Sequence, residues 1–108
     1  MVQEIKNLEE FKQLINGGKP VSTVAVAVDF HAQWCGPCKV IGPKFIKLAE
    51  KFPDIVFAKV DVDEAADVAE EYSIRAMPTF MFFADGEKKD EVVGANAALI
   101  EAKLNALL

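Results

Sequence analysis

The stretch TVAVAVDFHAQWCGPCKVIGPKF (residues 23–45) places two cysteines between a strand pattern and a helix pattern. Over residues 23–30 valines alternate with alanines, a β-branched run that is typical of a central strand packed on both faces. Beyond Cys35 and Cys38, apolar residues recur at helical spacing as far as Pro53. The cysteine pair is therefore predicted to lie where a strand passes into a helix.

The flanking sequence continues the alternation of strands and helices. We predict helices from Asn7 to Gly17, over residues 64–72 with Asp61 or Asp63 as the cap, and behind Asn96, and strands over residues 55–62, 79–84 and 88–93. Strand, helix, strand implies parallel pairing, whereas the Asp85-Gly86 turn favours an antiparallel hairpin. These elements predict an α/β fold with one mixed sheet between helix layers, and a site near the carboxyl ends of the parallel strands.

Length and composition set limits on organisation and partners. A chain of 108 residues, 52% hydrophobic and 27% charged, is suited to one domain over residues 1–108. A net charge of −5 argues against nucleic acid as a partner. The sequence has neither a signal-peptide pattern nor an apolar stretch that could span a membrane, so we expect a cytoplasmic protein with no membrane partner.

The two cysteines are predicted to carry chemistry. A disulfide between Cys35 and Cys38 would close too short a loop to add much stability, and the chain, with two Cys and one His, offers too few ligands for a usual zinc site, so we expect no metal. A helix N-terminus favours a thiolate. We expect Cys35 to be partly ionised and solvent-accessible, and Cys38, one turn deeper, to be shielded and able to attack a mixed disulfide.

Asp29 is the second candidate for a chemical role. A carboxylate inside an apolar strand is costly to bury and should have a raised pKa, which would let it accept the proton of Cys38 near pH 7. Lys59, on the neighbouring strand, could tune it. The alternatives at this point are a plain strand-end carboxylate for Asp29 and a solvated lysine for Lys59.

Beyond these patterns, the sequence resembles the thioredoxin family along nearly its whole length. The matching segments, in the family's order, are Val28-Asp29-Phe30, Trp34-Cys35-Gly36-Pro37-Cys38-Lys39, Pro43, Ala58-Lys59-Val60-Asp61-Val62-Asp63, Ile74-Arg75-Ala76-Met77-Pro78-Thr79-Phe80, Asp85-Gly86 and Val93-Gly94-Ala95. Cys-Gly-Pro-Cys is the form of the cysteine motif that distinguishes this family from its oxidising and isomerising relatives. The resemblance implies a central mixed five-stranded sheet flanked by four helices.

The resemblance also implies a role for each matching residue. Cys35 would be the attacking thiol, Cys38 the resolving thiol, Asp29 the buried acid and Lys59 its strand neighbour. Pro78 would be a cis-proline that faces the cysteines. The substrate groove would be formed by Trp34, Gly36, Pro37, Ala76, Met77, Pro78, Gly94 and Ala95.

The activity implied by the resemblance is the reduction of protein disulfides by a thiol-disulfide oxidoreductase. The partners implied are thioredoxin reductase, which would hold the NADPH and FAD that this chain does not bind, and target proteins such as peroxiredoxin, methionine sulfoxide reductase and ribonucleotide reductase. We expect a monomer. A non-catalytic protein-binding module and a disulfide oxidase or isomerase of the same fold are the alternatives, and redox poise separates the last two from a reductase.

His31 departs from the family pattern, because it stands where an aromatic residue is usual. An imidazole near the cysteines adds a group that titrates close to neutral pH. We expect a modest effect of His31 on the pH dependence of Cys35 reactivity.

Overall fold

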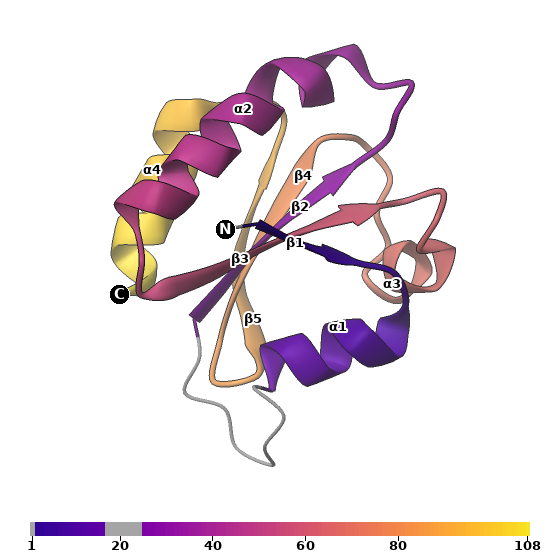
Figure 1. Ribbon diagram of the computed structural model, residues 1–108, viewed down its shortest axis with the longest axis horizontal. Helices are drawn as coiled ribbons and strands as arrows, with labels where there is room; N and C mark the ends of the chain where they lie inside the picture. Colours follow the sequence, from indigo (N-terminus) through magenta and orange to yellow (C-terminus); the bar gives the residue numbers. More distant parts are fainter. Residues whose placement is uncertain (1, 17–24) are drawn as a thin grey trace.

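A mixed β-sheet lies at the centre of the molecule, with helices on both of its faces (Figure 1). The computed structural model describes residues 2–16 and 25–108. Within these residues the elements are β1 (Val2–Ile5), α1 (Leu8–Ile15), β2 (Ala25–His31), α2 (Gly36–Lys51), β3 (Ile55–Asp61), α3 (Ala66–Glu71), β4 (Thr79–Ala84), β5 (Glu87–Val93) and α4 (Ala97–Leu107). The sheet has the strand order β1-β3-β2-β4-β5, which confirms the predicted five strands and four helices.

The central strand β2 connects the parallel and antiparallel halves of the sheet. It pairs in parallel with β3, from Ala25 opposite Ile55 to His31 opposite Asp61, and antiparallel with β4 on its other side. The strand is buried between Val26 and Phe30, as its valine and alanine run predicts. Pairing on both edges therefore fixes the backbone that leads into the cysteine motif.

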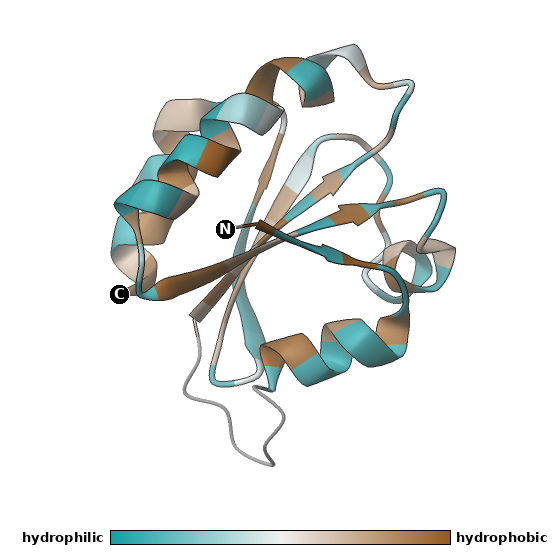
Figure 2. Ribbon diagram, viewed as in Figure 1, coloured by the Kyte–Doolittle hydropathy of each residue, from teal (hydrophilic) through white to brown (hydrophobic). Residues whose placement is uncertain are grey.

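Two hydrophobic clusters fill the space on either side of the sheet. On one face Ala27 and Phe57 pack beneath α2 and α4, and on the other face Phe11 of α1 packs against Phe30 and Phe83. Apolar residues colour much of the inner strands in Figure 2, whereas the helices alternate between polar and apolar residues. Alternation along β2 thus directs successive side chains to different cores.

Three predicted local signals are confirmed. The side chain of Asn7 accepts a hydrogen bond from the Glu10 N–H at 2.9 Å, and that of Asn96 accepts one from the Leu99 N–H at 3.0 Å, so both cap helices. Asp85 and Gly86 both have positive φ, at 57° and 76°, as a two-residue hairpin turn requires.

The cap predicted for α3 is wrong. Asp61 Oδ1 accepts hydrogen bonds from the backbone N–H groups of Asp63 and Glu64, at 2.9 and 3.3 Å, and so closes a turn ahead of the helix. The helix begins later, behind Ala65, without a side-chain cap. The predicted helix start at residue 64 is therefore replaced by a turn.

Other predicted boundaries shift by a residue or two. Strand β2 continues to His31 instead of ending at Phe30, and β3 ends at Asp61 instead of Val62. The predicted strand start at Thr23 and the predicted helix stop at residues 17–18 lie outside the described residues. Among the described helices, none combines the length and apolar character that a membrane crossing needs.

Candidate active site

Cys35 and Cys38 form a disulfide at the start of α2. Cys35 is the N-cap residue, its sulfur accepts a hydrogen bond from the Cys38 N–H at 3.2 Å, and the two Cα atoms are 5.4 Å apart. Pro37 falls in the first helical turn, where its missing N–H costs no hydrogen bond. The predicted placement of the pair at a helix N-terminus is confirmed. On reduction, the unpaired N–H groups and dipole there favour a Cys35 thiolate.

Both cysteines are buried in this disulfide form. Cys35 is 4% exposed and Cys38 is 6% exposed. The expected contrast between an accessible Cys35 and a shielded Cys38 is therefore wrong here. The physical reason is packing around the sulfurs: Ala32 is buried with them, and Val62 and Met77 cover the same cluster.

Three loops converge on the disulfide because of the strand register. Phe30 of β2 lies opposite Thr79 of β4, and Thr79 lies opposite Val93 of β5. The segments 32–38, 76–78 and 94–96, which adjoin these residues, therefore lie together at one end of the three strands. The Met77–Pro78 peptide is cis, as the resemblance implied. The Gly94 N–H donates to the Pro78 carbonyl at 2.8 Å, which joins two of these loops.

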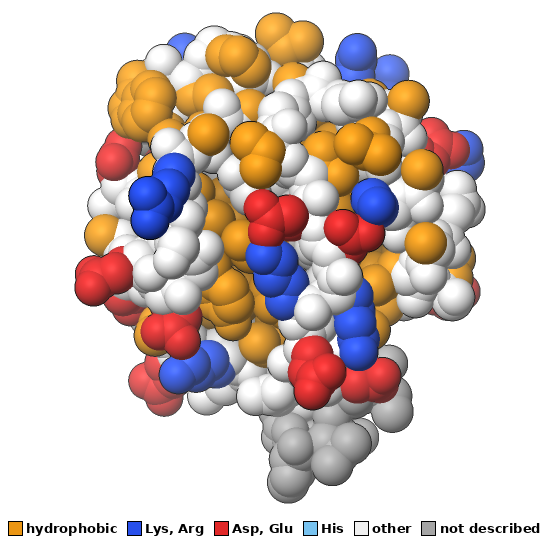
Figure 3. Space-filling model, turned by 180° about the vertical axis from the view of Figure 1, so that it is seen from behind, with side chains coloured by type: hydrophobic (Ala, Val, Ile, Leu, Met, Phe, Trp, Pro, Cys, Tyr) orange, Lys and Arg blue, Asp and Glu red, His pale blue; other side chains and the backbone are white. Residues whose placement is uncertain are grey.

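The predicted groove residues differ in exposure. Trp34 is 67% exposed, and Gly36, Pro37, Ala76 and Ala95 are exposed as well. Met77 and Gly94 are half-buried, and Pro78 is buried. In the view from behind, hydrophobic side chains gather over much of the upper part of the molecule, with Lys or Arg side chains among them at the rim (Figure 3). The exposed groove residues are themselves an indole, a proline, two alanines and a glycine, so this surface is largely apolar.

Trp34 has a polar partner that the sequence did not predict. Its indole Nε1–H donates to Asp63 Oδ2 at 3.0 Å, across 29 residues of sequence. Asp63 belongs to the turn that follows β3, and the parallel register places that turn beside the end of β2. The strand-end acids Asp61 and Asp63 were the available signal, but their residue types also fit a helix cap.

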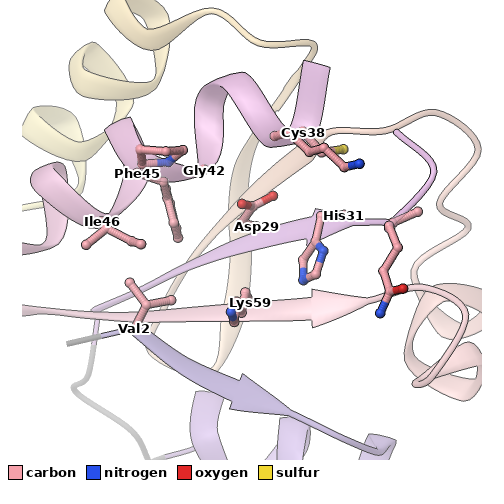
Figure 4. A pocket seen from close by; sticks show the side chains of 12 residues that line it. Val2, Asp29, His31, Cys38, Gly42, Phe45, Ile46 and Lys59 are labelled. Atoms are coloured by element: carbon pink, nitrogen blue, oxygen red, sulfur yellow. The ribbon is translucent and has the colours of Figure 1, made fainter. Parts of the chain in front are cut away.

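Asp29 lies beneath Cys38 in a pocket of about 800 Å³, between the sheet and the start of α2 (Figure 4). The residue is 4% exposed, and its Oδ1 finds no hydrogen-bond partner among the described residues. Burial raises the pKa of Asp29 to about 7, and the positive charge of Lys59 lowers it in part. Asp29 is thus buried, as its place inside an apolar strand predicts.

Lys59 faces the same pocket from β3. It is the register partner of Asp29, and its Nζ lies 3.9 Å from Glu4 Oε2 of β1. Its side chain is 43% exposed, so it reaches solvent while its charge still acts on Asp29. Lys59 is therefore solvated, and its positive charge also lowers the pKa of the Asp29 carboxyl group.

His31 lines this pocket as well, although its sequence context gave no sign of it. It is the last residue of β2, it is half-buried, and its Nε2 is buried with no hydrogen-bond partner among the residues described. Burial lowers the pKa of His31 and Lys59 lowers it further, whereas Asp61, Glu4 and Glu64 raise it.

Within the described part of the chain, no group of three or more His, Cys, Asp or Glu side chains could hold a metal ion.

The chain matches known proteins over nearly its full length. The thioredoxin family model matches residues 2–106. A thioredoxin of Coprinus comatus is 55% identical over 104 residues, which are 94% of this chain and 93% of that protein. The thioredoxin of Equus caballus is 44% identical over 108 residues, the whole of both chains. The solved Fasciola hepatica thioredoxin has a TM-score of 0.93 at 39% identity, over 99% of this chain and 100% of that one.

The matches and the site agree. Cys35 of the Cys-Gly-Pro-Cys motif caps α2 just beyond the end of the central strand β2. The disulfide lies beside the loop that holds the cis-proline and above the buried acid. The chain therefore belongs to the thioredoxin family and is a protein-disulfide reductase whose redox pair is Cys35 and Cys38.

Proposed function

We propose that Cys35 attacks the target disulfide and that Asp29 accepts the proton of Cys38 when Cys38 resolves the mixed disulfide. In the first step the Cys35 thiolate forms a bond to one target sulfur, and the other leaves as a thiolate. In the second step the Cys38 thiol gives its proton to Asp29 and bonds to Cys35 Sγ. The remaining target sulfur then leaves with the electron pair of the broken bond.

The observation that carries the role of Asp29 is its position. Asp29 and Cys38 line one pocket, and Figure 4 shows the carboxyl group extending from β2 toward the helix that bears Cys38. An acid with a pKa of about 7 is a base of suitable strength near neutral pH. In this proposal Lys59 keeps that pKa from rising further.

The apolar surface around the disulfide is proposed to bind an extended segment of the target. Pro78 would lie beneath the segment, and its borders would be formed by Trp34, Gly36, Pro37, Ala76, Met77, Gly94 and Ala95. The backbone next to Pro78 would pair with the target in strand-like fashion. A flat apolar surface is suited to exposed protein disulfides in preference to small molecules.

A thioredoxin works with a reductase and with target proteins, and thioredoxins bind no cofactor. We propose thioredoxin reductase, with its NADPH and FAD, as the source of electrons. Peroxiredoxin, methionine sulfoxide reductase and ribonucleotide reductase are the proposed targets. A solved structure 38% identical to this chain, covering 98% of it, concerns the thiol resolving mechanism of a yeast mitochondrial 1-Cys peroxiredoxin via glutathione/thioredoxin systems, which supports the first of these.

We further propose a single-domain monomer that acts in the cytoplasm. A reducing compartment suits a protein that must regain two thiols after each turnover. Solved relatives also include mitochondrial thioredoxin 3 of Saccharomyces cerevisiae, so fractionation of cells is the measurement that decides between these compartments.

A single-turnover reaction tests the assignment of the two cysteines and of Asp29. The reduced protein is mixed with a chromogenic aromatic disulfide, which releases one coloured thiolate when Cys35 attacks and a second when Cys38 resolves. We expect Asp29→Asn to slow the second release by about 100-fold at about pH 7, with a smaller effect at about pH 9, where hydroxide in solution can take the proton instead.

Two variants serve as controls for this reaction. Cys38→Ser should give the first release only, and Cys35→Ser should give neither. Normal kinetics of the second release in Asp29→Asn, from about pH 6 to about pH 9, would show that Asp29 is not the proton acceptor. Retained function in Cys35→Ser would favour a binding module over redox chemistry.

A further inference from the structure

Two buried polar atoms without partners face the same pocket. Asp29 Oδ1 and His31 Nε2 both lack a hydrogen-bond partner among the described residues, and both residues line the pocket beneath Cys38. They are two residues apart on β2, so alternation places them on one face of the strand at a spacing of about 7 Å. Buried polar groups are nearly always hydrogen-bonded, to water where the protein offers no partner. Water in this pocket would satisfy both atoms.

The two residues differ in their access to solvent. Asp29 is almost fully buried in the middle of the strand pairing, opposite Lys59 on one side and Phe80 on the other. His31 ends the strand and is half-buried. Figure 4 shows it beside Asp29, over β3 and farther along the strand. Asp29 thus has almost no exposed surface, whereas His31, at the end of the strand, is partly exposed.

We propose that His31 is a proton-relay residue, which carries the proton of Asp29 to solvent through water in the pocket. This rests on the proposed role of Asp29 in the resolution step. Asp29 first receives the Cys38 proton while the Cys35–Cys38 bond forms and the bond from Cys35 to the target breaks. Water then takes this proton from Asp29 and protonates His31 Nε2, and His31 releases the proton from Nδ1 to solvent. No electrons move in the relay, and the carboxylate is regenerated.

The charges around His31 suit such a relay. Lys59 lowers the pKa of the imidazole, as burial does, while the carboxylates of Asp61, Glu4 and Glu64 raise it. Lys39 and Cys38 of α2 also line the pocket. Burial lowers the pKa of the imidazole and so favours its neutral form, in which one ring nitrogen can accept a proton. The carboxylates of Asp61, Glu4 and Glu64 stabilise the protonated ring, through which the relay passes briefly.

The single-turnover reaction with the aromatic disulfide also tests the relay, at low buffer concentration. A soluble pH indicator reports when the proton of Cys38 reaches solvent. We expect His31→Gln to delay this proton release by about tenfold, while both thiolate releases change far less because they precede the relay. Glutamine keeps a hydrogen-bonding side chain in the pocket but cannot carry a proton. In His31→Ala, added imidazole should restore the release of the proton to solvent in a concentration-dependent and saturable manner. The protein with His31 intact should not respond to imidazole.

The variants also separate a relay from a purely structural role. If His31→Gln releases the proton to solvent at the normal rate, or if imidazole leaves His31→Ala unchanged, His31 only holds water or fills space and the relay is wrong. An unchanged first release in each variant shows that the fold and Cys35 are intact. Asp29→Asn, measured alongside, distinguishes the two failures: if it still slows the second release, only the relay fails, and if it does not, the proton acceptor itself is misassigned.

Discussion

Trp34 and Asp63 are joined by a hydrogen bond from the indole nitrogen to a carboxylate oxygen, 3.0 Å long. The bond links the loop that precedes the disulfide to the turn that follows β3. The indole ring is 67% exposed, so this contact, and not burial, determines where the ring lies beside the cysteines.

Asp63→Ala is expected to free the Trp34 side chain. The reduction of a protein disulfide should slow by about two- to fivefold, because one wall of the groove loses its fixed position, while stability should change by less than about 1 kcal/mol at so exposed a site. Trp34 fluorescence anisotropy and turnover with a protein substrate check both effects. Glu64→Gln is the matched control, since it also removes a negative charge from this turn, whereas the hydrogen bond to Trp34 comes from Asp63. Equal turnover in the two variants would contradict a positioning role for Asp63.

Asp29 is expected to make the oxidised protein less stable as pH rises. Its folded pKa of about 7 lies above the ordinary value of 3.8, so the folded state binds more protons than the unfolded state between these pH values. The stability contribution of Asp29 is complete below about pH 4, falls through that window, and is lower by about 4 kcal/mol above about pH 7. Urea unfolding of the protein and of Asp29→Asn at about pH 4 and about pH 8 measures this. A constant difference between the two proteins would refute it.

Lys59→Gln is expected to raise the pKa of Asp29 above about 7. The lysine charge now opposes the effect of burial, and its removal leaves burial alone. Titration of the Asp29 carboxyl carbon by NMR reports this pKa directly. Lys12→Gln is a suitable control because α1 lies on the opposite face of the sheet. If both variants titrate alike, Lys59 does not tune Asp29.

Phe11→Ala is expected to weaken the fold by about 3 to 5 kcal/mol. The ring is fully buried and packs against Phe30, Tyr72 and Phe83. Since these contacts lie across the sheet from the Asp29 pocket, the two-step thiolate release should stay normal in protein that remains folded. Leu99→Ala, at a side chain that is 41% exposed, should cost far less. Chemical denaturation gives the free energies, and a loss below about 1 kcal/mol for Phe11→Ala would contradict its place in the core.

Local patterns were sufficient where a signal is carried by neighbouring residues. Neighbouring residues alone determine three of the predicted features: the strand at the alternating valines of β2, the helix starts at the asparagine caps of α1 and α4, and the Asp85-Gly86 turn. Strand β1 carries no such local signal. It has four residues, of which only Ile5 is buried, so its sequence shows no alternation of apolar and polar residues that would indicate a strand. Its pairing with β3, from Val2 opposite Phe57 to Ile5 opposite Val60, makes it a strand. The residue pattern therefore predicted four strands, and the fifth came from the family resemblance.

The candidate site shows the same division. The cysteine motif and the misplaced carboxylate of Asp29 stand out in the sequence because their chemistry is costly or unusual. The burial of Cys35, the bond between Trp34 and Asp63 and the place of His31 in the pocket depend on which segments meet at the end of β2. Those meetings are set by sheet register, which a single sequence does not contain. An aspartate that satisfies a turn also has the same residue type as one that caps a helix.

The strand order has a consequence for how activity arises during synthesis. The two cysteines and Asp29 occur within the first 38 residues of the chain, yet β2 gains its second neighbour only when β4, directly behind Pro78, is in place, and Gly94 comes later still. A nascent chain that has reached α3 thus holds both thiols with one side of the central strand unprotected. Premature reaction with other disulfides is a hazard for such a fragment, and rapid closure of the β4–β5 hairpin ends it.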